Sequence, residues 1–175
     1  MLKKMSFFIG CFILVLPLLS YGFDCNKPDF GAELEDINKD GYFVKYMEKK
    51  GISYYNYSGP CSMRMHYFIN PSISYAFIDN QFYAQIINIS KSEETIEEMI
   101  QKIKELGSRI DASTYKLLQQ GDFKIYLWHN EQKKLKIKAK IHTKTKMVKV
   151  AKYYEPLRAK LPNLKEEDDP VSLMH

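Results

Sequence analysis

The segment DINKDG carries the spacing closest to a known chemical site in this 175-residue chain. Asp36, Asn38 and Asp40 place oxygen-bearing side chains at alternate positions, and Gly41 stands where a calcium-binding loop turns sharply. The twelfth position of the loop is Met47, where calcium loops have a glutamate that supplies two oxygens. Because that ligand is missing, a polar turn is the favoured alternative. The segment is therefore only a weak candidate for a metal site, and no metal ion is predicted.

Catalytic groups do not form a motif elsewhere. The histidines are His66, His129, His142 and His175. No two of them have metal-ligand spacing, and none adjoins a serine or cysteine nucleophile motif. The chain has no glycine-rich phosphate loop, and most carboxylates fall in a helix start and a tail, where solvent keeps them ionised. The sequence therefore predicts neither an enzyme nor a cofactor, although a triad assembled in space stays open.

Tyrosines are dense between positions 42 and 57. We take Tyr54, Tyr55 and Tyr57 as candidate binding residues, because exposed tyrosines stack on sugar rings or anchor protein partners. The favoured alternative is a tyrosine-rich core, since tyrosine is commonly half-buried. Tyr54 and Tyr55 are adjacent in a predicted strand and must point to opposite faces, so we expect one ring on the outer surface.

Lysines alternate with apolar residues over positions 134–142. We take Lys136, Lys138 and Lys140 as further candidate binding residues, because such a stripe could hold a polyanion. The stripe lacks interleaved aromatics and arginines, which favours a solvated sheet face that resists aggregation, and no nucleic acid partner is expected. A third interpretation is that the acidic residues at 166–169 fold back over the lysines.

The first residues have the pattern of a secretory signal. Lys3 and Lys4 precede an apolar run that is short for a membrane span, and small residues end at Gly22. Cleavage there predicts a periplasmic or secreted protein that meets the membrane only before cleavage; the alternative is an uncleaved anchor. The chain thus divides into a signal peptide over residues 1–22, a single α+β domain over 23–162 and a flexible acidic tail over 163–175.

Two cysteines remain after cleavage, Cys25 and Cys61. An exported protein meets an oxidising compartment, so we expect a disulfide between them. It would close a loop of about 36 residues and stabilise the fold by roughly 3–4 kcal/mol. Catalytic or metal-binding thiols are the alternative, which the absence of a CxxC pair disfavours.

The elements that position these residues centre on ISYAFIDNQFYAQIINI, residues 73–89. Asp79 and Asn80 tolerate the left-handed backbone of a two-residue turn, which makes the segment a hairpin. The predicted apolar face consists of Ile73, Tyr75, Phe77, Phe82, Ala84 and Ile86. The clearest helix follows, with apolar residues from Ile96 to Leu106 at helical spacing and a capping box from Ser90 to Glu93. We expect this stripe to pack on the hairpin, which would place Ile100 and Phe77 in one core.

Residues 32–50 are mostly helix-compatible, residues 63–69 form a possible strand, and 108–120 is ambiguous between a short helix and an edge strand. The predicted fold is therefore α+β: an antiparallel sheet of about five to six strands with a helix packed on one face, plus an N-terminal helical region. The predicted function is a small non-catalytic binding or inhibitor-type protein acting on another envelope or extracellular protein. The alternative is a cell-envelope glycan-binding protein or enzyme that uses the tyrosine cluster.

Overall fold

The structure is a computed structural model that describes residues 23–25, 27–60, 72–89, 94–108 and 114–164. Several sequence predictions lie outside the described residues: the signal peptide, Cys61, the possible strand over 63–69, the capping box from Ser90 to Glu93, and the tail from residue 165.

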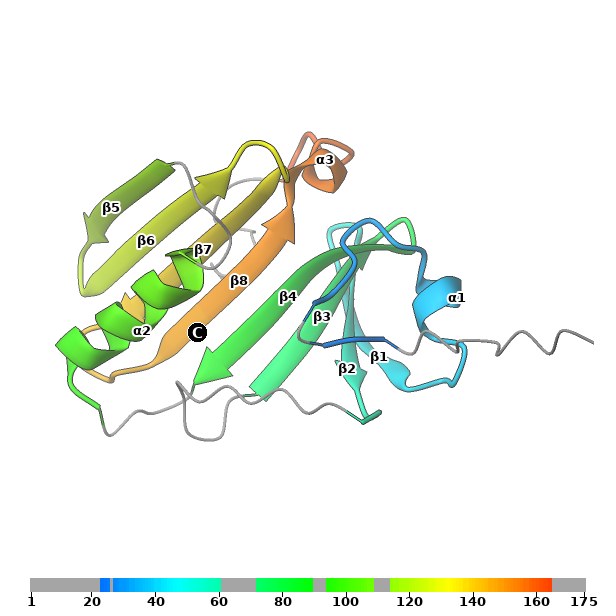
Figure 1. Cartoon of the computed structure of the whole chain (residues 1–175), viewed down its shortest axis with the longest axis horizontal. Helices are drawn as coiled ribbons and strands as arrows, with labels where there is room; N and C mark the ends of the chain where they lie inside the picture. Colours follow the sequence, from blue (N-terminus) through cyan, green and yellow to red (C-terminus); the bar gives the residue numbers. More distant parts are fainter. Residues whose placement is uncertain (1–22, 26, 61–71, 90–93, 109–113, 165–175) are drawn as a thin grey trace, which may run out of the picture.

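The chain forms one antiparallel sheet of eight strands (Figure 1). In chain order the elements are α1 (Leu34–Ile37), β1 (Phe43–Lys49), β2 (Ile52–Tyr57), β3 (Ser72–Ile78), β4 (Gln81–Ile89), α2 (Ile96–Ser108), β5 (Thr114–Gln120), β6 (Phe123–Asn130), β7 (Leu135–His142), β8 (Val148–Tyr154) and α3 (Glu155–Arg158). The spatial order of the strands is β1-β2-β3-β4-β8-β7-β6-β5. Two four-stranded meanders therefore meet where β4 pairs with β8, and each meander follows a helix. No helix in the described part of the chain is long and apolar enough to cross a membrane.

The prediction of five to six strands and an N-terminal helical region is wrong, because two further segments are strands. Within residues 32–50 only α1 is helical, a turn follows it, and residues 43–49 form β1. The helix ends at Ile37 with Asn38 as its C-cap, and Gly41 has a φ of +71° in the turn before β1. Pairing with β2 then decides between conformations that the local sequence leaves open. The ambiguous segment resolves in the same way, since β5 pairs along its whole length with β6.

The central hairpin is confirmed at its turn. Asp79 and Asn80 have φ values of +49° and +62°, and Phe77 pairs with Phe82. Beyond that pair the register differs from the prediction, because a bulge lies beside Phe77 and Tyr75 pairs with Gln85 instead of an alanine. A bulge adds one residue to one strand, so the later residues of β4 change faces.

Each face of the sheet has its own cover. On one face, α2 buries Met99 and Ile103 against β4 and the second meander, including Trp128 and Val150. On the same face of the first meander, Phe23, Phe30 and α1 cover an aromatic cluster. The residues of that cluster are Phe43, Tyr55, Tyr75, Phe77 and Phe82. On the opposite face, α3 and the segment after it cover a third cluster, with Leu157 and Leu164 packed among residues of both meanders.

The helix α2 therefore packs beside the cluster that contains Phe77 and not on it. Ile100 packs against the α2 cluster, whereas Phe77 belongs to the aromatic cluster. The predicted shared core of Ile100 and Phe77 is wrong because α2 covers the second meander, whose strands follow it in the chain (Figure 1).

The capping box that the structure describes lies at Thr95 and Glu98. The Thr95 hydroxyl accepts the Glu98 N–H at 3.2 Å, while the Glu98 carboxylate accepts the Thr95 N–H at 2.8 Å. These reciprocal hydrogen bonds start α2 at Ile96. The Glu98 carboxylate accepts hydrogen bonds from the Thr95 backbone N–H and from the Thr95 hydroxyl, which favour its ionised form and lower its pKa.

Candidate functional site

The structure brings the three predicted lysines onto one face of the sheet. Lys136, Lys138 and Lys140 alternate along β7, while the residues between them face α2. Lys149 of β8 lies directly opposite Lys140 in the register and joins them. We refer to these four residues as the lysine face. The alternation in the sequence predicted three of its members, and only the pairing with β8 reveals the fourth.

Water has less access to the lysine face than the sequence predicts. Lys138 is 4% exposed, and Lys140 and Lys149 are half-buried. Burial, followed by repulsion from Lys140, lowers the pKa of Lys149 to about 8. Burial and then the charge of Lys138 also lower the pKa of Lys140. The face thus concentrates positive charge where the charged forms are poorly solvated.

Two contacts offset part of this charge. The Glu155 carboxylate forms an ion pair with the Lys136 ammonium and lies 2.8 Å from His129 Nε2. The Lys140 ammonium lies 4.1 Å from the centre of the Phe123 ring, which is a cation–π geometry. Glu155 therefore compensates the end of the lysine face at Lys136, and Phe123 stabilises the opposite end.

The candidate tyrosines are separated by the sheet. Tyr54 is 3% exposed and packs in the cluster under α3, whereas Tyr55 is 9% exposed and packs in the aromatic cluster on the other face. The prediction that one of these two rings lies on the outer surface is wrong, because both faces of β2 are covered. Tyr57 is half-buried, with its ring 4.8 Å from that of Phe43. Tyr54 and Tyr55 are therefore core residues, as the alternative interpretation of the tyrosine-rich segment predicted.

Exposed apolar side chains gather at β1 instead. Among the described residues, Tyr42, Val44 and Tyr46 are 37%, 57% and 49% exposed, and the remaining large exposed apolar side chain is Leu117 of β5. β1 is the last strand at its end of the sheet, so its outer edge has no pairing strand in the described structure. Sequence reasoning missed this surface because it predicted a helix here. The available signal was the apolar residue at every second position, Tyr42, Val44 and Tyr46, which is typical of a strand.

The calcium-loop candidate is a turn in this structure. Asn38 Oδ1 accepts the N–H of Phe43 at 2.8 Å, and the Asn38 N–H donates to the Leu34 carbonyl at 2.9 Å. Asp36 lies within α1, and Asp40 is exposed. Asn38 thus joins the end of α1 to the start of β1. Within the described ranges, no three side chains of His, Cys, Asp or Glu gather in a way that could hold a metal ion.

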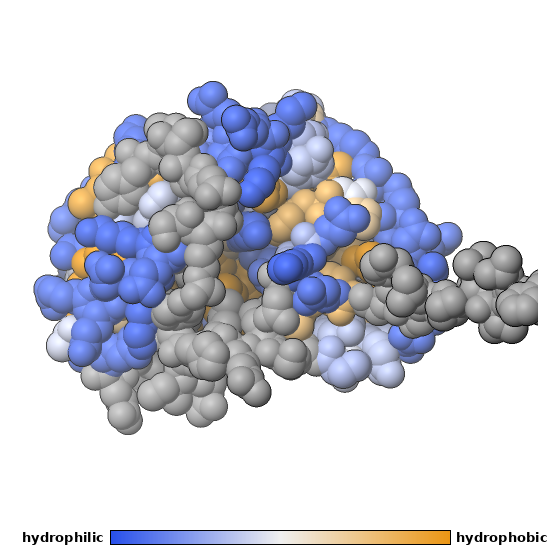
Figure 2. All heavy atoms as spheres, viewed as in Figure 1, coloured by the Kyte–Doolittle hydropathy of each residue, from blue (hydrophilic) through white to orange (hydrophobic). Residues whose placement is uncertain are grey.

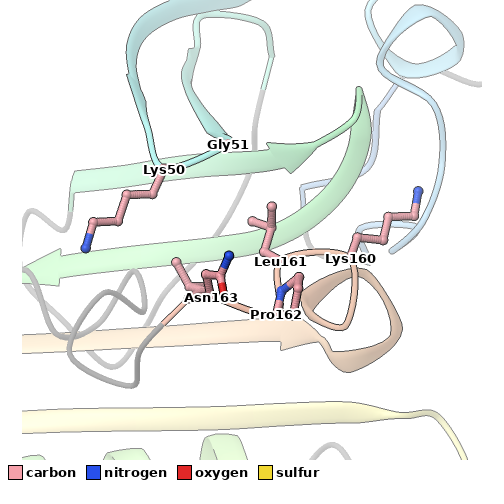
Figure 3. A pocket seen from close by; sticks show the side chains of 7 residues that line it. Lys50, Gly51, Lys160, Leu161, Pro162 and Asn163 are labelled. Atoms are coloured by element: carbon pink, nitrogen blue, oxygen red, sulfur yellow. The ribbon is translucent and has the colours of Figure 1, made fainter.

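A hollow lies between the β1–β2 turn and the segment after α3 (Figure 3). Its lining consists of Lys50, Gly51, Lys160, Leu161, Pro162, Asn163 and Leu164. Gly51 has a φ of +78°, and a Cβ there would lie 3.0 Å from a methyl carbon of Leu161, so both the turn and the packing require glycine. The side chains of Lys50 and Lys160 point away from each other (Figure 3). Because a catalytic pocket needs convergent polar groups, this hollow is no active-site candidate.

The remaining predicted groups are only partly described. Cys25 is buried, and its carbonyl accepts a hydrogen bond from Gln85 at 3.0 Å. Its predicted partner Cys61 lies outside the described residues, so the disulfide stays a prediction. His142 Nδ1 accepts the N–H of Thr145 at 3.1 Å, which commits one ring nitrogen to a turn. His66 and His175 lie outside the described residues.

Figure 2 shows the face that α2 covers. Hydrophilic residues dominate over the α2 half of this view, and hydrophobic residues gather over the half that contains α1. Comparison with protein-family models, with curated proteins and with solved structures finds no match for this chain.

Proposed function

We propose that this protein is an exported, non-catalytic binding module that contacts a protein partner through the outer edge of β1. The observation that carries the proposal is the exposure of Val44 and Tyr46 in β1, and of Tyr42 directly before it, on a strand whose outer edge is unpaired among the described strands. An exposed apolar edge strand is a liability that soluble proteins normally avoid. Its presence therefore supports a surface that is covered in use.

The mode of binding follows from the strand itself. An extended segment of the partner would add main-chain hydrogen bonds to β1 and pack apolar side chains on Val44 and Tyr46. β1 also has a bulge between Lys45 and Met47, and Lys45 forms an ion pair with Glu48. Bulges and charges discourage indiscriminate strand pairing, so they favour a partner with a matching shape and charge.

The glycan-binding alternative loses part of its basis. Tyr54 and Tyr55 are buried, so they offer no stacking surface for a sugar ring. Tyr57 packs its ring against Phe43 and Tyr42. The exposed aromatic residues at β1 are spaced along an edge, which suits an extended peptide better than a compact sugar.

The test compares one double variant and one single variant with the wild-type protein in capture from an envelope extract of its own host. Val44→Lys with Tyr46→Lys should abolish capture of a partner that the wild-type protein retains. Leu117→Lys is the matched control, because Leu117 is equally exposed on the strand at the other end of the sheet. It should keep the partner. Equal retention by all three proteins would contradict the proposal.

A further inference from the structure

We propose that two copies of this chain pair antiparallel through the outer edge of β1, with Lys45 of each copy opposite Glu48 of the other. This edge has no pairing strand in the part of the chain that the structure describes. The proposal goes beyond the proposed function, because it identifies a second copy as the occupant of the edge when no other protein is bound. It rests on the backbone, the side-chain faces and the charges of β1 itself.

The bulge in β1 brings Lys45 and Glu48 onto the same face of the strand. Lys45 lies opposite Tyr55 of β2, and Glu48 lies opposite Ser53, two residues further along the same strand. Residues three apart in a regular strand point to opposite faces, whereas the extra residue of the bulge puts these two side chains on one face. The ion pair between the Lys45 ammonium and the Glu48 carboxylate agrees with this placement.

The main-chain groups of the same two residues point away from β2. The Ser58 N–H donates to the Tyr42 carbonyl at 3.0 Å, so the opposed residues at the start of this ladder are a hydrogen-bonded pair. Hydrogen-bonded and non-hydrogen-bonded pairs alternate along an antiparallel ladder, and Lys45 lies three pairs after Tyr42. The N–H and C=O groups of Lys45 therefore face outward. Those of Glu48 do the same, because the bulge puts it in the same phase, so each copy offers hydrogen-bonding groups at both positions.

One antiparallel register suits both copies at once. Placing Lys45 opposite Glu48 of the second copy aligns outward-facing main-chain groups with each other, and the two-fold symmetry repeats the pair with the copies exchanged. The same register places Tyr46 opposite Met47 of the second copy, which brings an aromatic ring to a thioether. Both of these side chains lie near Tyr54: the Tyr46 ring centroid is 6.3 Å from that of Tyr54, and Met47 packs against the same cluster. A shift by one residue puts outward groups opposite inward groups, so the register is specific.

The charges select this pairing more than they strengthen it. Lys45 and Glu48 are exposed, and exposed ion pairs contribute little to stability. They do penalise any register that places like charges opposite each other. Burial of Val44 and Tyr46, which are 57% and 49% exposed in one copy, supplies the apolar part of the association. One pair of edge strands buries less than the roughly 1,200 Å² of stable complexes, so we expect the dimer to be weak and reversible.

The test uses the variants Lys45→Glu and Glu48→Lys, first alone and then mixed. In sedimentation velocity the wild-type protein should have twice the mass of one chain at about 0.5 mM and the mass of one chain at about 5 µM. Each variant alone should stay monomeric at the higher concentration, because like charges then lie opposite each other. An equimolar mixture of the two variants should recover the dimer, because a strand with two carboxylates then faces a strand with two ammonium groups.

The matched control is Lys116→Glu, which changes the net charge as Lys45→Glu does. Lys116 is exposed on β5, at the opposite end of the sheet, so this variant should dimerise like the wild-type protein. Recovery in the mixture also shows that both single variants are folded. The proposal is overturned if the wild-type protein is monomeric at the higher concentration, if the single variants dimerise, or if their mixture stays monomeric.

This outcome is separate from that of partner capture, which uses the protein at concentrations where the dimer dissociates. Capture of a partner by a protein that is monomeric at the higher concentration would overturn this inference and leave the proposed function standing. A wild-type dimer that follows the charge pattern, in a protein that captures no partner, would contradict the proposed function and support this inference.

Discussion

At the scale of single residues, the structure is governed by which polar and charged groups find partners. Asn38 joins α1 to β1 through the backbone of Phe43, and Glu155 joins Lys136 to His129. Lys138 shows how far a side chain can depart from its usual place, since it is 4% exposed. Residue type alone predicts an exposed lysine, and only the cross-strand environment determines otherwise.

The capping box of α2 gives the first prediction. Thr95→Ala removes the hydroxyl that accepts the Glu98 N–H and should lower the free energy of unfolding by about 1 kcal/mol. Gln101→Ala, at an exposed position of the same helix, is the control and should change stability by less than about 0.5 kcal/mol. Urea unfolding measures both. Equal values for the two variants would show that the box does not stabilise α2.

Tyr75 gives a prediction about alkaline pH. Its burial raises the pKa of the phenol to about 12, against an ordinary value near 10. Below pH 10 the phenol is neutral in both states; between pH 10 and 12 it ionises first in the unfolded chain, so stability falls as pH rises. Between pH 9 and pH 11 the wild type should lose about 1.4 kcal/mol more than Tyr75→Phe. Parallel losses in urea unfolding would contradict the assigned pKa.

At the scale of elements, the sequence predicted what local chemistry decides. The turn at Asp79 and Asn80 follows from residue types that accept positive φ, and the stripe that contains Met99 and Ile103 follows from helical spacing. β1 was missed because its sequence FVKYMEK contains good helix formers, and pairing with β2 overrides them. The bulge in the hairpin has no clear local signature, so two of the six residues of its predicted apolar face, Ala84 and Ile86, lie on the opposite side of the sheet.

The separation of the aromatic cluster from the α2 cluster gives the third prediction. Phe77→Ala and Ile100→Ala should be additive within about 0.5 kcal/mol in a double-mutant cycle, because the two residues belong to different clusters. Phe77 and Phe82 are the positive control, since their ring centroids are 5.4 Å apart and should couple by about 0.5–1.5 kcal/mol. Strong coupling between Phe77 and Ile100 would contradict this separation, because it would mean that α2 packs on the aromatic cluster of the hairpin.

At the scale of the whole molecule, two meanders become one sheet through the β4–β8 pairing. The cluster under α3 contains residues of both meanders, among them Ile86 and Ala151, which are directly opposite. The sequence gives no indication that β4 and β8, the last strands of the two meanders, pair with each other. This arrangement leaves β1 and β5 at the two ends of the sheet.

The pairing of β4 with β8 predicts that the two meanders unfold cooperatively. Ile86→Ala in the first meander should cost about 2–5 kcal/mol. Trp128, the single tryptophan, lies in the second meander, and its fluorescence should report the full loss. Val44→Ala is the control, because Val44 is exposed and its truncation should leave the Trp128 transition within about 0.5 kcal/mol of the wild type. If Ile86→Ala leaves the unfolding transition reported by Trp128 fluorescence unchanged, the meanders unfold independently.

Hydrogen exchange on the bound complex tests the central claim, that the edge of β1 is the partner-binding surface. The protein is labelled alone and with the captured partner, and the amides of β1 and β5 are compared. If the partner adds a strand to β1, amides within Phe43–Lys49 should exchange about tenfold or more slowly in the complex, while those of β5 stay unchanged. Slowing confined to other surfaces, with β1 exchanging at its free rate, would contradict the account.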